Sequence, residues 1–200
     1  EEFKNFIDKA HQLKMGIICD IVPNHMCVYD PANKWWFDVL EKGKDSPYAQ
    51  YFDIDWSGSE KILFPILDRP FGEALEHQQI SVVQKEGKYF LSVSPFLLPI
   101  DPKTWKDLPA DLGTFNGKKG DPRSFDALEK FIDAQHYRLS YWRVASEELN
   151  CRRFFDIVHF AGLHIEIPEV FQAVHALVFS WLRQGLIDGI RIDHIDGLWD

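Results

Sequence analysis

Two segments of the chain show the same pattern, a helical stripe of apolar positions followed by a short apolar run. In the first segment, the spacing of one helix face is followed by Phe3, Phe6, Ile7, Ala10 and Leu13. Gly16 stands where that helix would end, and the run of residues 17–22 (IICDIV) precedes Pro23. Such a run is typical of a strand that is buried on both faces of a parallel sheet.

The second segment begins at Pro168, which suits the first turn of a helix, and Glu166 and Glu169 favour a helix start there. One helical stripe is formed by Val170, Val174, Leu177, Val178, Trp181 and Leu182. Gly185 ends this helix, and residues 186–193 (LIDGIRID) are predicted as the second buried strand.

Between these segments, residues 29–125 hold most of the prolines and glycines and many aromatic residues. Their short patterns predict an inserted, irregular subdomain, with a strand at Lys88–Val93 after a hairpin turn at Lys85–Lys88. Residues 126–150 are predicted to be helical, including the stretch Gln135–Arg138.

The order helix, strand, insertion, helix, strand predicts an α/β fold with parallel strands. Polar residues follow both strands, and in a (β/α)8 TIM barrel the carboxyl ends of the strands form the active-site face. A closed barrel takes about 250 residues, so we interpret the chain as part of a barrel cut from a longer protein. The expected domains are a barrel helix and strand at 1–28, an inserted subdomain at 29–125, and barrel helices with a second strand at 126–200.

Composition narrows the classes of partner. The formal net charge of -9 repels phosphate backbones and anionic lipid surfaces, so neither nucleic acid nor a membrane is an expected partner. The three cysteines, Cys19, Cys27 and Cys151, have no regular spacing and form no CxxC pair. We expect reduced thiols and a cytoplasmic location, and we expect neither a cofactor nor a metal ion.

The ends of the two predicted strands carry the candidate chemistry. Arg191 and Asp193 are two apart in a strand and therefore share a face. A guanidinium beside a carboxylate keeps the carboxylate ionised and oriented, as a glycosyl nucleophile must be. Asp20 on the first strand is the natural partner of Arg191 if the two strands are neighbours. Surface ion pairing, and solvation of Asp20 at the strand end, are the simpler alternatives.

Further polar residues follow the strands. Asn24 and His25 lie on the loop after Pro23, where a neutral imidazole could hydrogen-bond a sugar hydroxyl, although a capping or core role is the alternative for the histidine. His194 and Asp196 could reach a sugar in a neighbouring subsite, although Asp196 with the following glycine also suits a simple turn.

An aromatic cluster lies in the predicted insertion, at Trp35, Trp36, Phe37, Tyr48, Tyr51, Phe52 and Trp56. Such rings can line an oligosaccharide cleft, because sugars stack their apolar faces on aromatic side chains. The interpretation that we favour for most of them is a small core of the insertion itself.

Together these motifs resemble those of the α-amylase family. Asp20–His25 (DIVPNH) is similar to the first conserved region of that family, at the end of its third barrel strand. Gly189–His194 (GIRIDH) is similar to the second, at the end of the fourth strand. The insertion between them stands where the family places its B domain. The resemblance therefore implies the third and fourth strands of a (β/α)8 barrel with a B-type insertion.

A narrower resemblance, to the maltooligosyltrehalose synthases, extends over nearly the whole chain. It rests on the blocks Asp20–Met26, Trp35–Leu40, Ser46–Ala49, Tyr51–Trp56, Tyr137–Leu139, Tyr141–Arg143, Arg152–Asp156, Arg191–His194 and Asp196–Leu198. The chain departs from that pattern at Cys151, Val158, His159 and Ile195. These departures concern details near the substrate and allow a divergent activity.

The resemblance implies an isomerase of glycoside hydrolase family 13, a (1→4)-α-D-glucan 1-α-D-glucosylmutase of trehalose biosynthesis. Asp193 would be the nucleophile, Arg191 would orient it, and Asp20 would help hold the pair. The substrate-binding residues would be Asp20, Asn24, His25, His194 and Asp196. The substrate would be a maltooligosaccharide, and the pathway partner would be maltooligosyltrehalose trehalohydrolase.

The resemblance also implies that the general acid, a glutamate after the next barrel strand, lies outside this chain. Helical or connecting segments are predicted to hold Glu147, Glu148, Glu166 and Glu169. The chain alone is therefore expected to be inactive. Two other functions stay open, another α-1,4-glucan hydrolase or glucanotransferase of the same family, and a non-catalytic glycan-binding barrel remnant.

Overall fold

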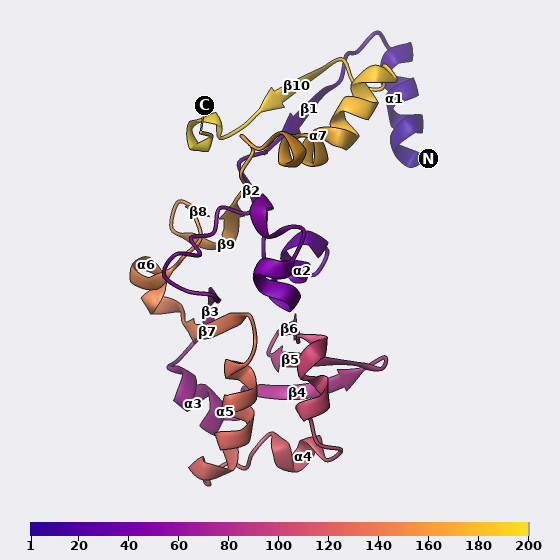
Figure 1. Cartoon of the computed structure of the whole chain (residues 1–200). Helices are drawn as coiled ribbons and strands as arrows, with labels where there is room; N and C mark the ends of the chain where they lie inside the picture. Colours follow the sequence, from indigo (N-terminus) through magenta and orange to yellow (C-terminus); the bar gives the residue numbers. More distant parts are fainter. Residues whose placement is uncertain (200) are drawn as a thin grey trace. The chain divides into compact units, whose positions relative to one another are not determined.

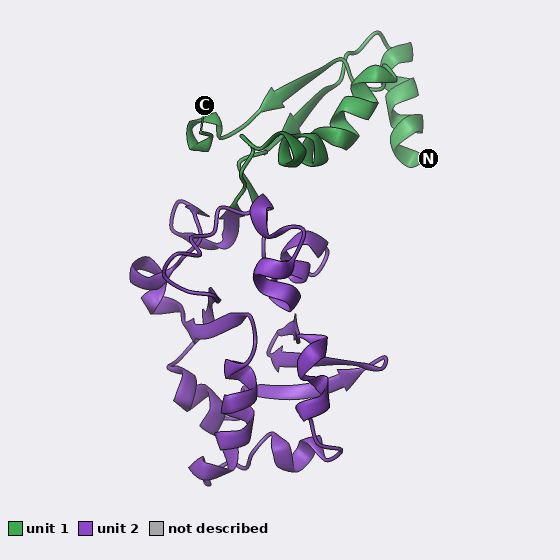
Figure 2. Ribbon diagram, in the orientation of Figure 1, with its two compact units in different colours: residues 1–26, 162–200 green, residues 27–161 purple. Residues whose placement is uncertain are grey.

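A computed structural model of the chain describes residues 1–199 (Figure 1). The chain divides into two compact units: unit 1 comprises Glu1–Met26 and Gly162–Asp200, and unit 2 comprises Cys27–Ala161 (Figure 2). Residues 126–161, which we grouped with the barrel on sequence grounds, fall in unit 2. The units are defined by compactness alone, so the domain boundaries at 28 and 125 stay a prediction.

Unit 1 contains both predicted helix–strand pairs. They are α1 (Glu2–Gln12) with β1 (Ile18–Ile21), and α7 (Pro168–Arg183) with β10 (Gly189–Ile192). α1 ends at Gln12, four residues before Gly16, and the turn that follows holds Lys14 at φ 58°. The two helices touch through the rings of Phe3 and Trp181, whose centroids are 4.7 Å apart.

β1 and β10 form a two-stranded parallel sheet, as the sequence predicted for neighbouring strands. The register pairs Cys19 with Ile190 and Ile21 with Ile192, so these apolar side chains share one face. A small cavity between Ile21 on this face and Val174 and Val178 of α7 shows that the helix runs beside it (Figure 1). The opposite face carries the charged residues of both strands.

The expectation that both strands are buried on two faces is wrong for the residues that the structure describes. Ile18 is 72% exposed and Ile192 is 44% exposed. The physical reason is that a sheet of two strands leaves each strand with one unpaired edge and little cover. Apolar residues such as Ile18 and Ile192 are typical of strands that have a neighbouring strand on each side in a complete parallel sheet.

Unit 2 has a parallel pair at its centre, β3 (Ile62–Leu67) with β7 (Tyr137–Tyr141). The helical prediction for residues 126–150 is confirmed for α5 (Asp126–Asp133) and is wrong for β7. Tyr137 and Leu139 are buried while Arg138 is exposed, which is the two-residue period of a strand. Pairing with the buried β3 outweighs the local helical pattern.

A three-stranded antiparallel sheet forms another layer of unit 2, from β4 (Ile80–Lys85), β5 (Lys88–Val93) and β6 (Phe96–Pro99). The predicted strand at Lys88–Val93 and its hairpin turn are confirmed. The turn holds Glu86 at φ 51° and Gly87 at φ 77°, the pair of positive values that a tight hairpin favours.

The other elements are short. The helices are α2 (Lys34–Lys42), α3 (Phe71–Glu76), α4 (Leu112–Phe115) and α6 (Ala145–Glu148), and the remaining strands are β2 (His25–Cys27), β8 (Arg153–Phe154) and β9 (Ile157–Gly162). At the two ends of unit 2, the backbone N–H of Val28 donates to the carbonyl of His159 at 2.9 Å. The unit therefore begins and ends at one place.

The aromatic cluster is divided between core and surface. Trp36 and Phe52 are each 1% exposed, and their rings meet edge to face with centroids 4.9 Å apart. For these two residues the predicted small core is confirmed. Trp35, Tyr48 and Tyr51 contact one another and are only partly buried, with centroid distances of 5.0 to 5.9 Å.

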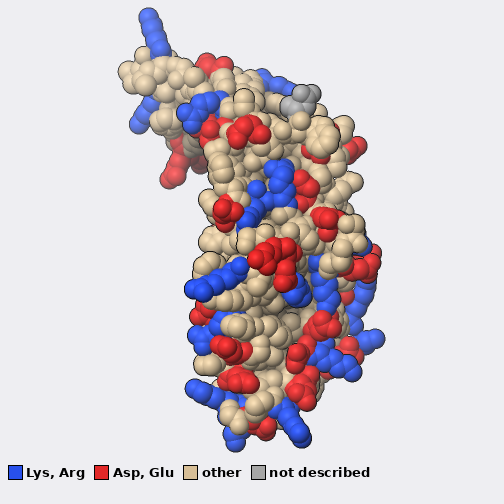
Figure 3. Space-filling view, turned by 90° about the vertical axis from the view of Figure 1, so that its left-hand side faces the viewer, with Lys and Arg blue, Asp and Glu red and all other residues tan. Residues whose placement is uncertain are grey.

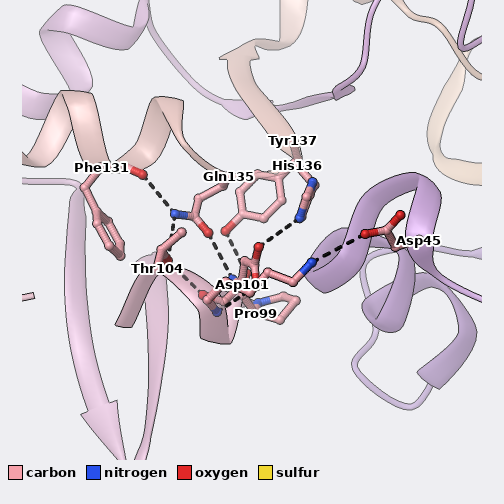
Figure 4. A network of polar contacts seen from close by, with 9 residues as sticks. Asp45, Pro99, Asp101, Thr104, Phe131, Gln135, His136 and Tyr137 are labelled. Atoms are coloured by element: carbon pink, nitrogen blue, oxygen red, sulfur yellow. Dashed lines mark hydrogen bonds and ion pairs between the residues drawn. The ribbon is translucent and has the colours of Figure 1, made fainter. Parts of the chain in front are cut away.

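A buried polar network ties the segment before β7 to the loop after β6 (Figure 4). Gln135, 2% exposed, accepts from the N–H of Asp101 at 3.0 Å and donates to the carbonyl of Phe131 at 2.9 Å. The Asp101 carboxylate lies 3.1 Å from Nε2 of His136. The Tyr137 hydroxyl donates to the carbonyl of Pro99 at 2.9 Å. These contacts satisfy polar groups that would be costly to bury unpaired.

Charged side chains of both signs are interspersed on the face of the molecule shown in Figure 3. The net charge of -9 is therefore not gathered into one acidic patch on that face. Within residues 1–199, no helix has both the length and the apolar character needed to cross a membrane.

Candidate active site

The centre of the candidate site in unit 1 is an ion pair across the β1–β10 sheet. The parallel register sets Asp20 directly opposite Arg191. The Arg191 guanidinium donates from Nη2 to Oδ2 of Asp20, which confirms that the two residues are partners. This carboxylate raises the pKa of the Arg191 guanidinium, and the charge of Asp193 adds a smaller effect in the same direction. Arg191 is therefore a fixed positive charge.

Asp193 follows β10 directly and extends the ladder by one bond. Its N–H donates to the carbonyl of Ile21 at 2.9 Å, which fixes the backbone at the strand end. Its Oδ2 lies 3.2 Å from Nε2 of His194. About half of the carboxylate side chain is exposed, at 45%, so a substrate can reach it.

His194 turns the chain away from the strand. Its backbone is left-handed, with φ 55° and ψ 44°, a conformation that is uncommon for residues other than glycine. This turn folds the imidazole back onto Asp193 and sets its ring 5.9 Å from the ring of His25. Two imidazoles and one carboxylate therefore lie together at the carboxyl end of the sheet.

Asn24 is the buried anchor of this group, at 3% exposure. Its carbonyl accepts from the N–H of Leu163 at 2.9 Å, and its Nδ2 lies 3.3 Å from Nδ1 of His25. Gly197 approaches it so closely that an added Cβ would lie 2.6 Å from Nδ2 of Asn24. The loops that follow the two strands are thus packed against each other.

The structure brings together six of the seven residues proposed from the sequence: Asp20, Asn24, His25, Arg191, Asp193 and His194. Asp196 is exposed on the short 3-10 turn Ile195–Gly197. The close approach of Gly197 was missed, because a glycine after an aspartate indicates a turn without showing what lies against it. The roles of all seven stay predictions.

A second polar group, also missed, holds the opposite end of the same sheet. Asp188, just before β10, accepts from the N–H of Ile17 at 2.7 Å and lies 3.2 Å from Nε2 of His11. The hydrogen bond from Ile17, and then the contact with His11, lower the pKa of the Asp188 carboxyl. In a (β/α)8 barrel, residues at the amino ends of the strands contribute to stability, and the catalytic residues lie at the carboxyl ends. We therefore assign the Asp188 contacts to stability.

The four candidate glutamates lie away from the strand ends, as expected. Glu147 and Glu148 are on α6, and Glu169 is in the first turn of α7. Glu166 lies in the segment before α7, 2.6 Å from Nδ1 of His164. Among residues 1–199, no group of three or more histidine, cysteine, aspartate or glutamate side chains is arranged to hold a metal ion.

The positions that depart from the synthase pattern differ in their surroundings. Cys151 pairs with Ile54 in an isolated β-bridge, and burial raises the pKa of its thiol to about 12. The His159 ring packs on the Tyr29 ring, with centroids 4.2 Å apart. Ile195 is 64% exposed on the turn after the candidate nucleophile.

Known proteins resemble this chain over nearly its whole length. Residues 1–199 match the family described as "Alpha amylase, catalytic domain". A "Putative maltooligosyl trehalose synthase" of Mycobacterium tuberculosis is 38% identical over 193 residues, which cover 96% of this chain and 21% of that protein. The chain therefore spans about a fifth of the length of this curated relative.

Solved structures agree in sequence and in fold. Maltooligosyltrehalose synthase from Arthrobacter ramosus is 37% identical, with a TM-score of 0.76 over 98% of this chain and 23% of that one. A hypothetical maltooligosyl trehalose synthase of Sulfolobus tokodaii is 31% identical, with a TM-score of 0.75 over 98% of this chain and 23% of that one. The predicted fold, a segment of a TIM-barrel enzyme, is confirmed, and so is the predicted likeness to the synthases. The chain belongs to the α-amylase family, as a partial segment of its catalytic domain.

Proposed function

We propose that this chain supplies the nucleophile half of the active site of a maltooligosyltrehalose synthase. The reaction would convert the reducing-end α-1,4 linkage of a maltodextrin into an α,α-1,1 linkage. The observation that carries the proposal is the register that sets Asp20 opposite Arg191, with Asp193 one step beyond Ile192. The likeness to synthases at 31–38% identity supports the choice of reaction within the family.

In the first step, the Asp193 carboxylate attacks the anomeric carbon of the penultimate glucose. The bond from that carbon to O4 of the reducing-end glucose breaks as a general acid protonates O4, and a covalent glycosyl-enzyme forms. Arg191, held by its ion pair with Asp20, would place a positive charge near this carboxylate and help to orient it.

In the second step, the released glucose turns while it is still bound. Its anomeric hydroxyl attacks the glycosyl carbon, loses its proton to the conjugate base of the general acid, and releases Asp193. Two displacements retain the configuration and need the acid about 5–5.5 Å from the nucleophile. Water must be excluded during this step, because water in place of glucose makes the enzyme a hydrolase.

His25, Asn24 and His194 would position the sugar. The imidazoles of His25 and His194 lie at the same strand ends as Asp193 and can hydrogen-bond hydroxyls of the transferred ring. Asn24 would act through His25, since its buried amide lies 3.3 Å from Nδ1 of that ring. Asp196, exposed on its turn, would face the neighbouring sugar.

We place the general acid outside residues 1–199, on a later strand of the barrel, so that the chain alone is inactive. The product, a dextrin that ends in a trehalosyl unit, would pass to a trehalohydrolase. The two proteins would then act in sequence in a cytoplasm where the three thiols stay reduced.

The test uses maltopentaose with three proteins: the whole protein that contains this chain, its Asp193→Asn variant, and the 200-residue chain. Reducing ends and free glucose are followed together. We expect the whole protein to consume reducing ends with little glucose, and the variant and the chain to leave both unchanged.

Each other result has a definite meaning. A gain of reducing ends by the whole protein would identify a hydrolase and overturn the proposed reaction. Full activity in the Asp193→Asn variant would remove Asp193 from the role of nucleophile. Turnover by the 200-residue chain would show that its general acid lies within residues 1–200.

A further inference from the structure

Unit 2 contains a cavity that the proposed chemistry does not use. Its volume is about 760 Å³, within the range of about 300–1,000 Å³ that is usual for small-molecule sites. All of its lining residues lie between Cys27 and Leu97, so the cavity is built by unit 2 alone. Four aromatic side chains contribute to it: Tyr29, Phe37, Phe90 and Phe96.

The strand register explains why one side of this cavity is available. In the β4–β5–β6 sheet, Leu91 and Val93 face the core and are 0% and 3% exposed. Lys88 and Phe90 alternate with them and lie on the other face, together with Lys85, which pairs with Lys88. The outer face of the hairpin therefore presents a facing pair of lysine side chains, Lys85 and Lys88, with the Phe90 ring two residues further along β5.

Tyr29, which also lines the cavity, is held by several contacts. The ring of Tyr29 packs on the rings of Phe96, Phe64 and His159, with centroid distances of 5.0, 5.3 and 4.2 Å. Its hydroxyl donates to the carbonyl of Pro65 at 3.3 Å. A wall fixed by four contacts loses little conformational freedom when a ligand binds.

The charges around the cavity cancel. Lys85 and Lys88 are exposed cations, and Asp30 and Glu86 are exposed anions. A phosphate or nucleotide site would carry an excess of positive charge. Aromatic walls with balanced polar groups suit a neutral ligand that has both apolar faces and hydroxyls, which is the character of a sugar ring.

We propose that this cavity binds a segment of neutral α-1,4-glucan, with a sugar ring packed against Phe90 and its hydroxyls bonded by Lys85 and Lys88. The proposal rests on the proposed function for its choice of glucan as the ligand. It adds a holding site in unit 2, built from residues other than the seven candidates in unit 1.

The test titrates the whole protein that contains this chain with β-cyclodextrin by isothermal calorimetry. This ring of α-1,4-linked glucose has no reducing end, so the proposed rearrangement cannot act on it. We expect binding by the unmodified protein and a Kd about tenfold weaker for Phe90→Ala, which corresponds to about 1.4 kcal/mol. The matched control is Trp142→Ala, which removes an aromatic ring that is 53% exposed elsewhere in unit 2.

A second variant keeps the test decisive if Phe90→Ala disturbs folding. Lys85 and Lys88 are both exposed, so Lys85→Ala/Lys88→Ala is expected to fold and to weaken binding about threefold to tenfold. Absence of binding by the unmodified protein would overturn the proposal. An unchanged Kd in both cavity variants, or an equal loss in Trp142→Ala, would also overturn it.

The outcome is separable from that of the proposed function. Cyclodextrin binding by a protein that hydrolyses maltopentaose would keep the glucan site and remove the synthase reaction. Rearrangement of maltopentaose by a protein that binds no cyclodextrin would keep the reaction and remove this site.

Discussion

Substitution of Gly197 by alanine tests whether the two loops of the candidate site are packed as tightly as the structure indicates. The new Cβ would lie 2.6 Å from Nδ2 and 2.7 Å from Oδ1 of Asn24, where ordinary contact begins at 3.4 Å. Relief of this overlap needs a shift of about 0.8 Å, the difference between 3.4 and 2.6 Å. Asn24 is 3% exposed, so the shift must move its neighbours or the turn that carries His194.

The expected cost follows from overpacking. Extra atoms in a packed site lower the free energy of unfolding by about 1–3 kcal/mol. Gly197 is not among the glycines with positive φ, so backbone strain adds nothing to the overlap. In the whole protein, displacement of catalytic groups by nearly 1 Å should lower kcat by about 10²-fold. Urea unfolding of the chain and maltopentaose kinetics of the whole protein measure the two effects.

Two comparisons isolate the contact. In Gly189→Ala, the new Cβ meets only Cγ1 of Ile18, at 3.9 Å, so stability should stay within about 0.5 kcal/mol. In an Asn24→Ala background the overlap is gone, so Gly197→Ala should then cost less than about 0.5 kcal/mol. An equal cost in both backgrounds, or a cost no greater than that of Gly189→Ala, would refute the reasoning.

Four further outcomes are expected. Asp193→Asn should lower kcat of the whole protein by at least about 10⁴-fold, because it removes the proposed nucleophile. The Tm should stay within about 1–2 °C of the unmodified value, because the side chain is half exposed. Asn150→Ala should lower the free energy of unfolding in urea by about 2–3 kcal/mol, since its amide accepts from one backbone N–H and donates to two carbonyls. Because the pKa of Asp188 is lowered in the folded state, its contribution to the free energy of unfolding is present above the ordinary carboxyl pKa of about 4 and is lost as the pH falls further. Asp188→Asn should therefore flatten the dependence of Tm on pH below about pH 4. At pH 8, iodoacetamide should modify the exposed Cys27 well before Cys151, whose thiol pKa is raised to about 12, and mass spectrometry of peptides measures this order.

The strands and helices of unit 1 could be predicted because each is marked locally. The helical stripes end near Gly16 and Gly185, the first apolar run ends before Pro23, and the second helix begins at Pro168; the structure has helices and strands at these places. The pairing of Asp20 with Arg191 could also be predicted, because a charged residue on an apolar strand needs a partner. What could not be read locally is exposure, which depends on the strands that flank β1 and β10.

The errors have a common physical origin in contacts between residues distant in sequence. Tyr137–Tyr141 fits a helical pattern with the residues before it, but pairing with β3, some 75 positions earlier, makes it a strand. Gly197 looks like an ordinary turn glycine until Asn24, 173 positions earlier, is placed against it. The pattern of residues around Tyr137–Tyr141 or around Gly197 does not show that β3 or Asn24 packs against it.

The hydrogen bond between Val28 and His159 has a consequence for the order of folding. Asp20 and Arg191 are 171 positions apart, and the entropy of closing so long a loop opposes their pairing. Unit 2 is continuous in sequence and meets itself at Val28 and His159, so its folding removes most of that loop. We therefore expect unit 2 to fold first. Until the chain beyond unit 2 has been synthesised, β1 has no β10 to pair with, and its apolar side chains stay exposed and prone to aggregation.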